Sequence, residues 1–401
     1  MKTKRLYYES AYTDHFTANV LSCEADGSRF RVILDRTAFY PEGGGQPCDL
    51  GTLGSANVTD VQKADGEIVH FTDAPLSGEV EGQIDFDARY RRMQNHTGEH
   101  IASGFFHRLY GAENVGFHMG SEDVTMDFDV MLDDYDIRRV ESLVNGAVYA
   151  DVPVTTSFPT AAELAATEYR SKLEFPEGAE VRLVTVDGYD VCACSATHVA
   201  RTGEVGIVKF LSWEKNKGGV RIHMLAGRDA FEDYVRLHNM ASETAQRYSV
   251  KIGELPDVMF RMDERLAKAK EERKSLVRAL CAEYVHRAEI LRAMDDGDKS
   301  SRGSIFPTVI CDADAAVFFA PLFDNEEMRA LANAAAEKFG YALVLSGDDC
   351  AGYTFVMISQ GLDCRDAVKE LKDVLTISGG GKNDMVSGKI RETQDVIINK
   401  I

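Results

Sequence analysis

Short hydrophobic stretches, separated by turn residues, fill the first part of the chain. Glu79–Ile84 alternates apolar and polar positions, and Phe30–Leu34 is mostly apolar, with Gly, Asp or Pro residues between such stretches. Short runs of this kind are typical of β-strands with a buried face. We expect further strands at Val58–Gln62 and Ile68–Phe71, and therefore a small β-barrel or sandwich over residues 1–88.

The hydrophobic spacing becomes helical at about Arg89 and stays helical as far as Tyr110. Gly111 follows, and a glycine at this position commonly ends a helix. The pattern then returns to mixed strands and helices. Strands are expected at Val181–Val186, Ile207–Phe210 and Val220–Met224. We therefore expect an α+β core over residues 89–228, built on the helix.

Residues 229–300 have the pattern of a long helix with polar faces. The apolar positions follow a 4-3-4-3 spacing, the heptad seam of a coiled coil or helical hairpin. They are Leu255, Met259, Met262, Leu266 and Ala269. Arg273 interrupts the seam and Pro256 suggests a break, so two antiparallel helices fit the pattern as well as one. We expect a spacer, with a homodimer forming through it or through the C-terminal domain.

Residues 301–401 are predicted to form a separate α/β domain. The expected order is strand Thr308–Cys311, helix Asn325–Phe339, strand Tyr341–Leu345, strand Thr354–Ile358 and helix Arg365–Leu375. Gly379, Gly380, Gly381 and Lys382 follow. A glycine run lets backbone N–H groups approach an anion, with Lys382 as the counter-charge, and a flexible turn explains it equally well. The fold class expected for the whole chain is α+β multidomain.

Composition limits the class and location of the protein. The 401 residues are 44% hydrophobic and 27% charged, which is ordinary for a globular protein. No apolar run approaches the roughly eighteen residues of a membrane span, and the N-terminus lacks the apolar core of a signal peptide. The eight cysteines show no disulfide-like spacing. We therefore expect a cytoplasmic protein without membrane contact.

The formal net charge of −20 argues against general, sequence-independent binding of nucleic acids. A specific RNA partner stays compatible with this charge, because salt limits the reach of distant charges to roughly 10 Å. Local basic groups therefore matter more than the total. Each of the following groups, taken by itself, is more simply a solvated face: Arg89, Arg91 and Arg92; Lys209, Lys215, Lys217 and Arg221; Lys382, Lys389 and Arg391.

Two short runs carry the strongest chemical signal. His96-Thr97-Gly98-Glu99-His100 and Cys194-Ser195-Ala196-Thr197-His198 each place two good zinc ligands four positions apart. On a helix or helical turn such residues share a face, so each run presents two ligands to one ion. The four residues together form a candidate Zn²⁺ site. Cys192 would point to the same side as Cys194 in a strand, and it stays an alternative ligand.

The first run also matches H-x-x-E-H, the pattern of inverzincin peptidases, in which Glu99 would be the general base. Gly98 weakens the centre of a helix by about 1 kcal/mol relative to alanine. The Cys194–His198 pair would then have no role, and a fourth protein ligand would fill the position that a peptidase keeps for water. The peptidase hypothesis is therefore the weaker one.

The same runs resemble motifs of a known family. Asn95–His100 and Cys194–Val199 look like the HTxxH and CxxTHV motifs of the alanyl-tRNA synthetase editing domain, and Phe39–Gly51 and Thr202–Gly206 match further motifs in the same order. Without an aminoacylation domain, the chain resembles the free-standing alanyl-tRNA editing proteins (AlaX type, long form). The C-terminal DHH-associated domain of that form has a signature similar to Gly379–Gly388.

Two departures from the family pattern affect what can be carried over. Ser195-Ala196 stands where the family usually has Gly-Gly, so two side chains are added close to the expected metal. Val386 stands where the glycine-rich signature usually has a small residue. The first departure alters the expected pocket, and the second weakens the transfer of the C-terminal domain's role.

The resemblance implies hydrolysis of the ester that joins serine, or glycine, to the 3′ end of tRNA(Ala), while Ala-tRNA(Ala) is spared. A synthetase pocket sized for alanine excludes these amino acids only modestly, so a second site is needed. By family analogy, Thr37 hydrogen-bonds the serine hydroxyl, Gln46 lines the pocket, and Glu99 is a general base or supports the zinc ligands. The expected substrate-binding residues are Gly43, Gly44, Gly45, Arg92 and Lys382. The alternative function is a non-catalytic, zinc-stabilised tRNA-binding protein.

Overall fold

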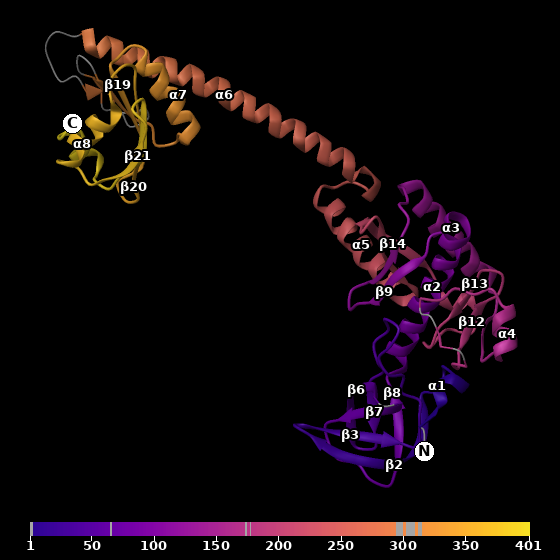
Figure 1. Cartoon of the computed structure of the whole chain (residues 1–401). Coiled ribbons are helices and arrows are strands. Elements are labelled where there is room, and N and C mark those ends of the chain that lie inside the picture. The colour runs from indigo at the N-terminus through magenta and orange to yellow at the C-terminus, as the bar shows by residue number, and fades with distance from the viewer. Residues whose placement is uncertain are drawn as a thin grey trace. The chain divides into compact units, whose positions relative to one another are not determined.

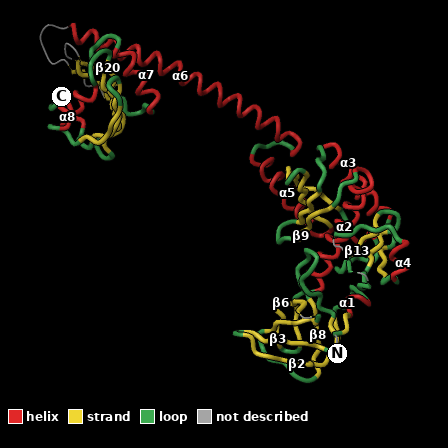
Figure 2. Tube along the Cα trace, viewed as in Figure 1, coloured by secondary structure: helices red, strands yellow, loops and turns green. Residues whose placement is uncertain are grey.

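The computed structural model divides the chain into two compact units, Met1–Thr244 and Ala245–Ile401 (Figure 1). Each unit contains both helices and strands (Figure 2). The structure describes residues 3–64, 66–172, 175–176, 178–293, 300–301, 309–311 and 315–401. Among these residues, no helix combines the length and the apolar composition that a membrane crossing requires.

Six strands of the first unit close into a barrel in the order β2-β3-β7-β6-β5-β8. Their bounds are His15–Asp26 (β2), Arg29–Leu34 (β3), Gly51–Leu53 (β5), Ala56–Ala64 (β6), Glu67–Thr72 (β7) and Glu79–Ile84 (β8). Every second residue of β8 is buried, as its alternating sequence predicts. Two short strands outside the barrel, β1 (Lys4–Arg5) and β4 (Arg36–Thr37), pair in parallel. The short helix α1 (Leu6–Glu9) follows β1 in the chain.

The rest of the first unit is built around α2 (Phe86–Tyr110). Gly111 ends this helix in the left-handed conformation (φ 63°), as predicted. Two antiparallel sheets, β14-β15-β10-β9 and β11-β12-β13, accompany the helix. Their strands are Asn114–Met119 (β9), Val124–Phe128 (β10), Val154–Ser157 (β11), Leu183–Val186 (β12), Asp190–Ala193 (β13), Val208–Asn216 (β14) and Gly219–Ala226 (β15). The further helices are α3 (Asp134–Ala150), α4 (Ala161–Ala166), η1 (Thr202–Val205) and α5 (Gly227–Arg247).

A buried ion pair connects α2 to the segment that leads into the barrel strand β5. Arg89 and Asp49 are both completely buried, and Arg89 Nε donates to both carboxylate oxygens at 2.9 Å. The guanidinium also donates to Ala11 O (2.9 Å) and Ala38 O (2.6 Å), while Asp49 accepts from the Tyr40 N–H (2.6 Å). Arg89 therefore belongs to the interior, and the interpretation of this residue as part of a solvated basic face is wrong.

The second unit is a seven-stranded sheet in the order β16-β17-β18-β19-β20-β22-β21. Its strands are Ser300–Ser301 (β16), Val309–Cys311 (β17), Ala315–Phe319 (β18), Tyr341–Asp348 (β19), Gly352–Ser359 (β20), Ile377–Gly381 (β21) and Met385–Ile390 (β22). Its helices are η2 (Ile252–Glu254), α6 (Leu255–Ala293), α7 (Asn325–Ala336), α8 (Cys364–Lys372) and α9 (Gln394–Ile398). Residues 294–299 of the predicted spacer and Thr308 of a predicted strand lie outside the described residues.

Each face of this sheet has its own hydrophobic core. Val344 packs with α7 and the C-terminal part of α6, whereas its neighbour Leu343 packs with residues of α8 and α9. Adjacent residues of a strand point to opposite faces, so β19 contributes to both cores. The predicted order of elements omits β18, although its sequence Ala-Ala-Val-Phe-Phe is a short apolar run, and this strand pairs in parallel with β19.

The helical segment consists of α5 and α6, with a break between Arg247 and Leu255. Pro256 lies in the first turn of α6, where its missing N–H disrupts no helical hydrogen bond. Of the predicted seam, Met259 is 67% exposed and Leu266 is 55% exposed. Coiled-coil pairing through this seam stays a prediction.

The Gly379–Gly381 run forms part of the edge strand β21, which pairs with β22. A Cβ atom on Gly381 would lie 2.1 Å from Met385 O, and one on Gly379 would lie 2.4 Å from Ser387 O. The glycines therefore permit close backbone packing within this hairpin. The prediction of a flexible turn is therefore wrong, whereas the binding of an anion by this run stays a prediction.

Lys382 is the first residue of the turn that joins β21 to β22. Its N–H donates to Met385 O at 2.8 Å, so its backbone is occupied by the turn. The role of its side chain in binding a substrate stays a prediction. Val386, which departs from the family pattern, is 2% exposed and packs into the core formed with α8 and α9.

Candidate metal centre

Helix α2 carries His96 and His100 on one face, with their ring centroids 5.4 Å apart. Both rings are buried. Gly98 lies between them and lets the helix approach the neighbouring sheet. A Cβ atom at this position would be 3.2–3.3 Å from side-chain atoms of Ala226, Met224 and Val208. The glycine that weakens the helix in isolation therefore allows its close packing in the folded unit.

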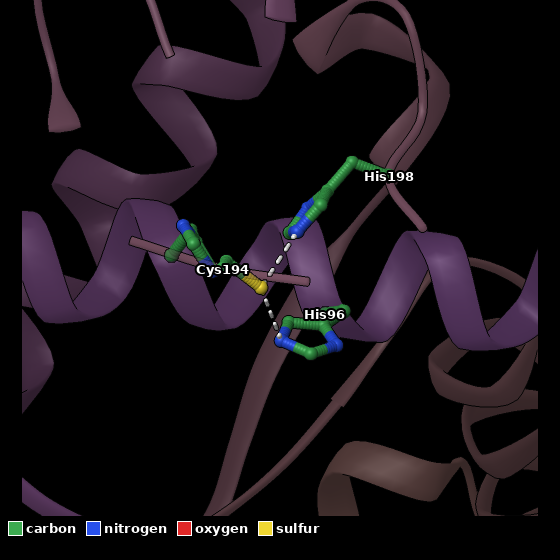
Figure 3. Close-up of side chains that lie close together, drawn as sticks. His96, Cys194 and His198 are labelled. Atoms are coloured by element: carbon green, nitrogen blue, oxygen red, sulfur yellow. Dashed lines mark hydrogen bonds between the residues drawn. The ribbon is translucent and has the colours of Figure 1, made fainter. Parts of the chain in front are cut away.

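Cys194 and His198 follow β13 in an irregular loop (Figure 3). The prediction that they share a helical face is therefore wrong. Arg182 holds the loop instead, because its Nη1 donates to Cys194 O and Ala196 O, each at 2.8 Å. The Val199 N–H donates to Thr97 Oγ1 of α2 at 3.3 Å, which places the loop against the helix without a helical turn.

The structure brings all four predicted ligands together. Cys194 Sγ lies 3.6 Å from His96 Nε2 and 3.5 Å from His198 Nε2 (Figure 3). One potential ligand atom from each of His96, His100, Cys194 and His198 lies within 4.8 Å of the others. Cys192 belongs to a neighbouring group with His100 and Asp190. The geometry therefore favours Cys194 over Cys192 as the sulfur ligand.

The second nitrogen of each histidine faces a different partner. His96 Nδ1 lies 2.8 Å from Gln46 Oε1, and His198 Nδ1 lies 3.0 Å from Thr97 Oγ1. His100 Nδ1 lies 3.2 Å from an oxygen of Asp190. His96 Nδ1 and His198 Nδ1 are thus hydrogen-bonded and His100 Nδ1 faces a carboxylate, which leaves the Nε2 atoms for a metal. The partners of these histidines are Gln46, Thr97 and Asp190.

These donors suit zinc in chemistry and in spacing. Zinc–nitrogen and zinc–sulfur bonds of about 2.0 and 2.3 Å in a tetrahedron place nitrogen and sulfur about 3.5 Å apart. Burial raises the pKa of the Cys194 thiol. The electrostatic interaction with His96 outweighs this effect, together with smaller contributions from hydrogen bonds to His100 and His198, and brings the pKa well below its usual range. Burial also lowers the pKa of His198 to about 3, so that its ring is neutral. Thiolate and neutral imidazole are the forms that bind zinc. Burial lowers the pKa of His100, but Cys192, Asp190 and Cys194 raise it well above its usual value, so this ring would release a proton when zinc binds.

Glu99 is buried beside the ligands and has its own hydrogen-bond partners. Its Oε1 accepts from Ser103 Oγ (2.7 Å) and from Asn114 Nδ2 (2.5 Å). Burial raises the pKa of the carboxyl, but the nearby Lys172 and His100 charges outweigh it and lower the pKa to about 2. A carboxylate held in this way is a weak base. These contacts favour a supporting role for Glu99 over that of a general base.

The glycine run at residues 43–45 forms a tight turn. The backbone N–H groups of Gly43 and Gln46 each donate to the other's carbonyl at 3.1 Å, and Gly44 and Gly45 have φ values of 62° and 79°. This is a type I′ turn, which favours glycine at both central positions. It places Gln46 beside His96. Contact of the glycines with a substrate stays a prediction.

Thr37 is completely buried, and its hydroxyl is already hydrogen-bonded. Thr37 Oγ1 lies 2.8 Å from His70 Nε2 and accepts from the Phe39 N–H at 3.0 Å. His70 Nδ1 lies 3.1 Å from Val32 O, and burial lowers the pKa of His70 to about 4, so a neutral ring accepts the Thr37 proton. Among the described residues, none of these contacts reaches a metal ligand. The role of Thr37 in selectivity stays a prediction.

The expected basic groups of the first unit are largely paired. Arg91 contacts Asp229 and Glu232 at 2.5 Å, and Arg221 donates to Asp127 at 2.6 and 2.7 Å. Arg92 is half-buried, with Nη1 3.5 Å from the buried carboxylate of Asp49. Its role in substrate binding stays a prediction. The sequence shows these cations but not their acidic partners, which lie far away in the chain.

Comparison with known protein families shows which class of protein this chain is related to. Residues 4–87 match the family model described as tRNA synthetases class II (A), and residues 181–223 match the threonyl and alanyl tRNA synthetase second additional domain. The second match includes Cys194 and His198. The chain is therefore related to the aminoacyl-tRNA synthetases.

The curated relatives narrow this relationship. The chain is 35% identical to the alanine–tRNA ligase of Natronomonas pharaonis over 374 residues, covering 89% of this chain and 38% of the relative. It is 29% identical to the alanine–tRNA ligases of Ignicoccus hospitalis and Pyrococcus abyssi, covering 98% of this chain and 42% of each relative. The chain is thus related to alanyl-tRNA synthetases and spans about two fifths of their length.

Proposed function

We propose that the chain hydrolyses the aminoacyl ester of mischarged tRNA(Ala), with Ser-tRNA(Ala) as the main substrate and Gly-tRNA(Ala) as the second. The observation that carries this proposal is the cluster of His96, His100, Cys194 and His198 in a chain related to alanyl-tRNA synthetases. We further propose that the protein acts in trans, on tRNA that a ligase has already charged.

In this proposal the cluster residues hold Zn²⁺. When bound, the ion supplies positive charge that polarises the ester carbonyl or acidifies a water molecule. Gln46 and Thr97 fix the orientation of two ligand rings, and Glu99 contributes a buried negative charge beside them. Cys194 is the one partly exposed ligand and the adjacent Ser195 is exposed, so the ester would approach from this side.

Selectivity requires that the site reject alanine. A buried group that hydrogen-bonds the serine hydroxyl does so, because alanine leaves that group unpaired, and such sites discriminate by about 10⁴-fold. Glycine leaves the same group unpaired, so Gly-tRNA(Ala) should be hydrolysed more slowly than Ser-tRNA(Ala). We assign this role to Thr37. Its proton is directed to His70, so its oxygen would accept a hydrogen bond from the serine hydroxyl. Gly43, Gly44, Gly45, Arg92 and Lys382 would contact the tRNA.

The test is release of labelled amino acid from Ser-, Gly- and Ala-tRNA(Ala) by the purified chain, with zinc content measured in parallel. We expect fast loss of serine with alanine spared, and loss of activity and zinc in Cys194→Ala. Cys192→Ala is the matched control and should keep both. A wild-type chain that binds zinc and is folded but releases no serine would support the non-catalytic tRNA-binding alternative. Equal release of serine and alanine would keep the hydrolase and reject the role of Thr37.

A further inference from the structure

One ligand of the proposed metal centre has a charged partner, whereas the other two histidines have neutral ones. Asp190 begins β13, and its carboxylate oxygen lies 3.2 Å from His100 Nδ1. The side chains of Asp190 and His100 are only 2% and 3% exposed. Arg170 donates to the same carboxylate through Nε (2.7 Å) and Nη2 (2.9 Å). The three side chains thus form a buried chain, His100–Asp190–Arg170.

The backbone holds Arg170 beside the strand that carries Asp190. Arg170 forms two main-chain hydrogen bonds with β13: its N–H donates to Val191 O (2.8 Å), and its carbonyl accepts from the Ala193 N–H (2.9 Å). The side chain of Arg170 therefore starts beside the strand that carries Asp190. The pair is held on a strand and does not depend on a mobile side chain.

Gly104 allows β13 to pack closely against α2. It lies one turn after His100 on α2, and a Cβ atom there would be 2.6 Å from Tyr189 O and 3.0 Å from Asp190 Cβ. Any larger residue would push the β12–β13 turn away from the helix. The close approach that brings Asp190 to His100 therefore requires a glycine at this position.

We infer that Asp190, held by Arg170, is the positioning residue for the metal ligand His100. This inference rests on the metal centre of the proposed function. A carboxylate that accepts the Nδ1 proton fixes the tautomer with a free Nε2, orients the ring and makes Nε2 a stronger donor to the metal. Among the described residues, His100 Nδ1 has no completed hydrogen bond, and the Asp190 carboxylate oxygen 3.2 Å away is the acceptor within reach of its proton.

A second metal position is the competing interpretation of the same residues. His100, Asp190 and Cys192 lie within 4.8 Å of one another and would offer nitrogen, oxygen and sulfur. The guanidinium of Arg170 already compensates the charge of Asp190 at hydrogen-bond distance and would repel a cation there. The geometry therefore favours one metal and a supporting ion pair.

The experiment measures Zn²⁺ affinity by competition with a chromophoric chelator, together with zinc stoichiometry. We expect one zinc for each wild-type chain and a 10- to 100-fold loss of affinity in Asp190→Ala. Asp190→Asn keeps an acceptor oxygen and the size of the side chain, and should lose less. Folding is verified by Trp213 fluorescence, and the visible spectrum of bound Co²⁺ should change in both variants if His100 is reoriented.

The matched control is Asp127→Asn. Asp127 binds Arg221 through the same two guanidinium nitrogens in the same unit, but away from the ligands. Its variant should bind zinc as the wild type does. Folded Asp190 variants with affinity within twofold of the wild type and an unchanged Co²⁺ spectrum would overturn the inference, and so would two zinc ions of which one is lost in Cys192→Ala. Absence of zinc from the wild type would overturn the metal centre as well, whereas zinc binding without ester hydrolysis would reject only the proposed function.

Discussion

The buried pair of Arg89 and Asp49 gives a sharp test of how the first unit is held together. Asp49→Ala would leave a guanidinium with no exposed surface, whose remaining acceptors among the residues that the structure describes are the carbonyls of Ala11 and Ala38. Breaking a buried pair by removing one member costs about 3–5 kcal/mol. The Tyr40 N–H also loses its acceptor, which adds about 1 kcal/mol. We therefore expect the free energy of unfolding to fall by about 5 kcal/mol.

The chain offers a selective probe and a matched control for this measurement. Trp213 is the single tryptophan of the sequence and lies in β14, so its fluorescence during urea or thermal unfolding follows the first unit. Asp127→Ala removes the partner of Arg221, which has similar geometry but is 38% exposed. An exposed pair contributes about 1 kcal/mol or less. The melting temperature should thus fall by about 10–20 °C in Asp49→Ala and by a few degrees in the control.

Both arginines bind their aspartate through the same two guanidinium nitrogens, so the two pairs differ mainly in burial. A difference between their losses of stability therefore measures the effect of burial. Equal losses in Asp49→Ala and Asp127→Ala would refute the reasoning. If Asp49→Ala does not fold, Asp49→Asn keeps an acceptor oxygen and provides a milder measurement of the same effect. A melting temperature unchanged in Asp49→Asn would likewise show that the buried charge does not determine the stability of this unit.

Three further predictions follow from single positions of the first unit. Burial lowers the pKa of His70 from 6.5 to about 4, so the unfolded state binds more protons than the folded state between these pH values. The free energy of unfolding should therefore fall by about 3 kcal/mol as the pH drops through this window. Urea unfolding at several pH values measures this loss, which should be absent in His70→Gln. Gly44→Ala should cost about 1 kcal/mol for its left-handed backbone, and Gly45→Ala at least twice as much, because its Cβ would also lie 2.4 Å from Phe117 O; equal losses would contradict this. Gly104→Ala should weaken zinc binding at least tenfold in the chelator assay, whereas Gly146→Ala, with open space at its Cβ, should leave zinc binding unchanged.

Local sequence determined the elements whose signals are contained within a few residues. The alternation of Glu79–Ile84 is sufficient to predict β8, and the helical spacing before Gly111 predicts α2 and its end. The His96 and His100 pair on one helix face also follows from sequence, because positions i and i+4 of a helix always face the same way. These features need no information from distant parts of the chain.

Tertiary structure alone decided what surrounds those elements. The partners of the three ligand histidines are Gln46, Thr97 and Asp190, and they come from a glycine turn, from α2 itself and from β13. The reason for Gly98 and the burial of Arg89 likewise depend on contacts between segments distant in sequence. Residue spacing shows which side chains are available for chemistry, but packing between segments decides which charges are buried and where each hydrogen bond goes.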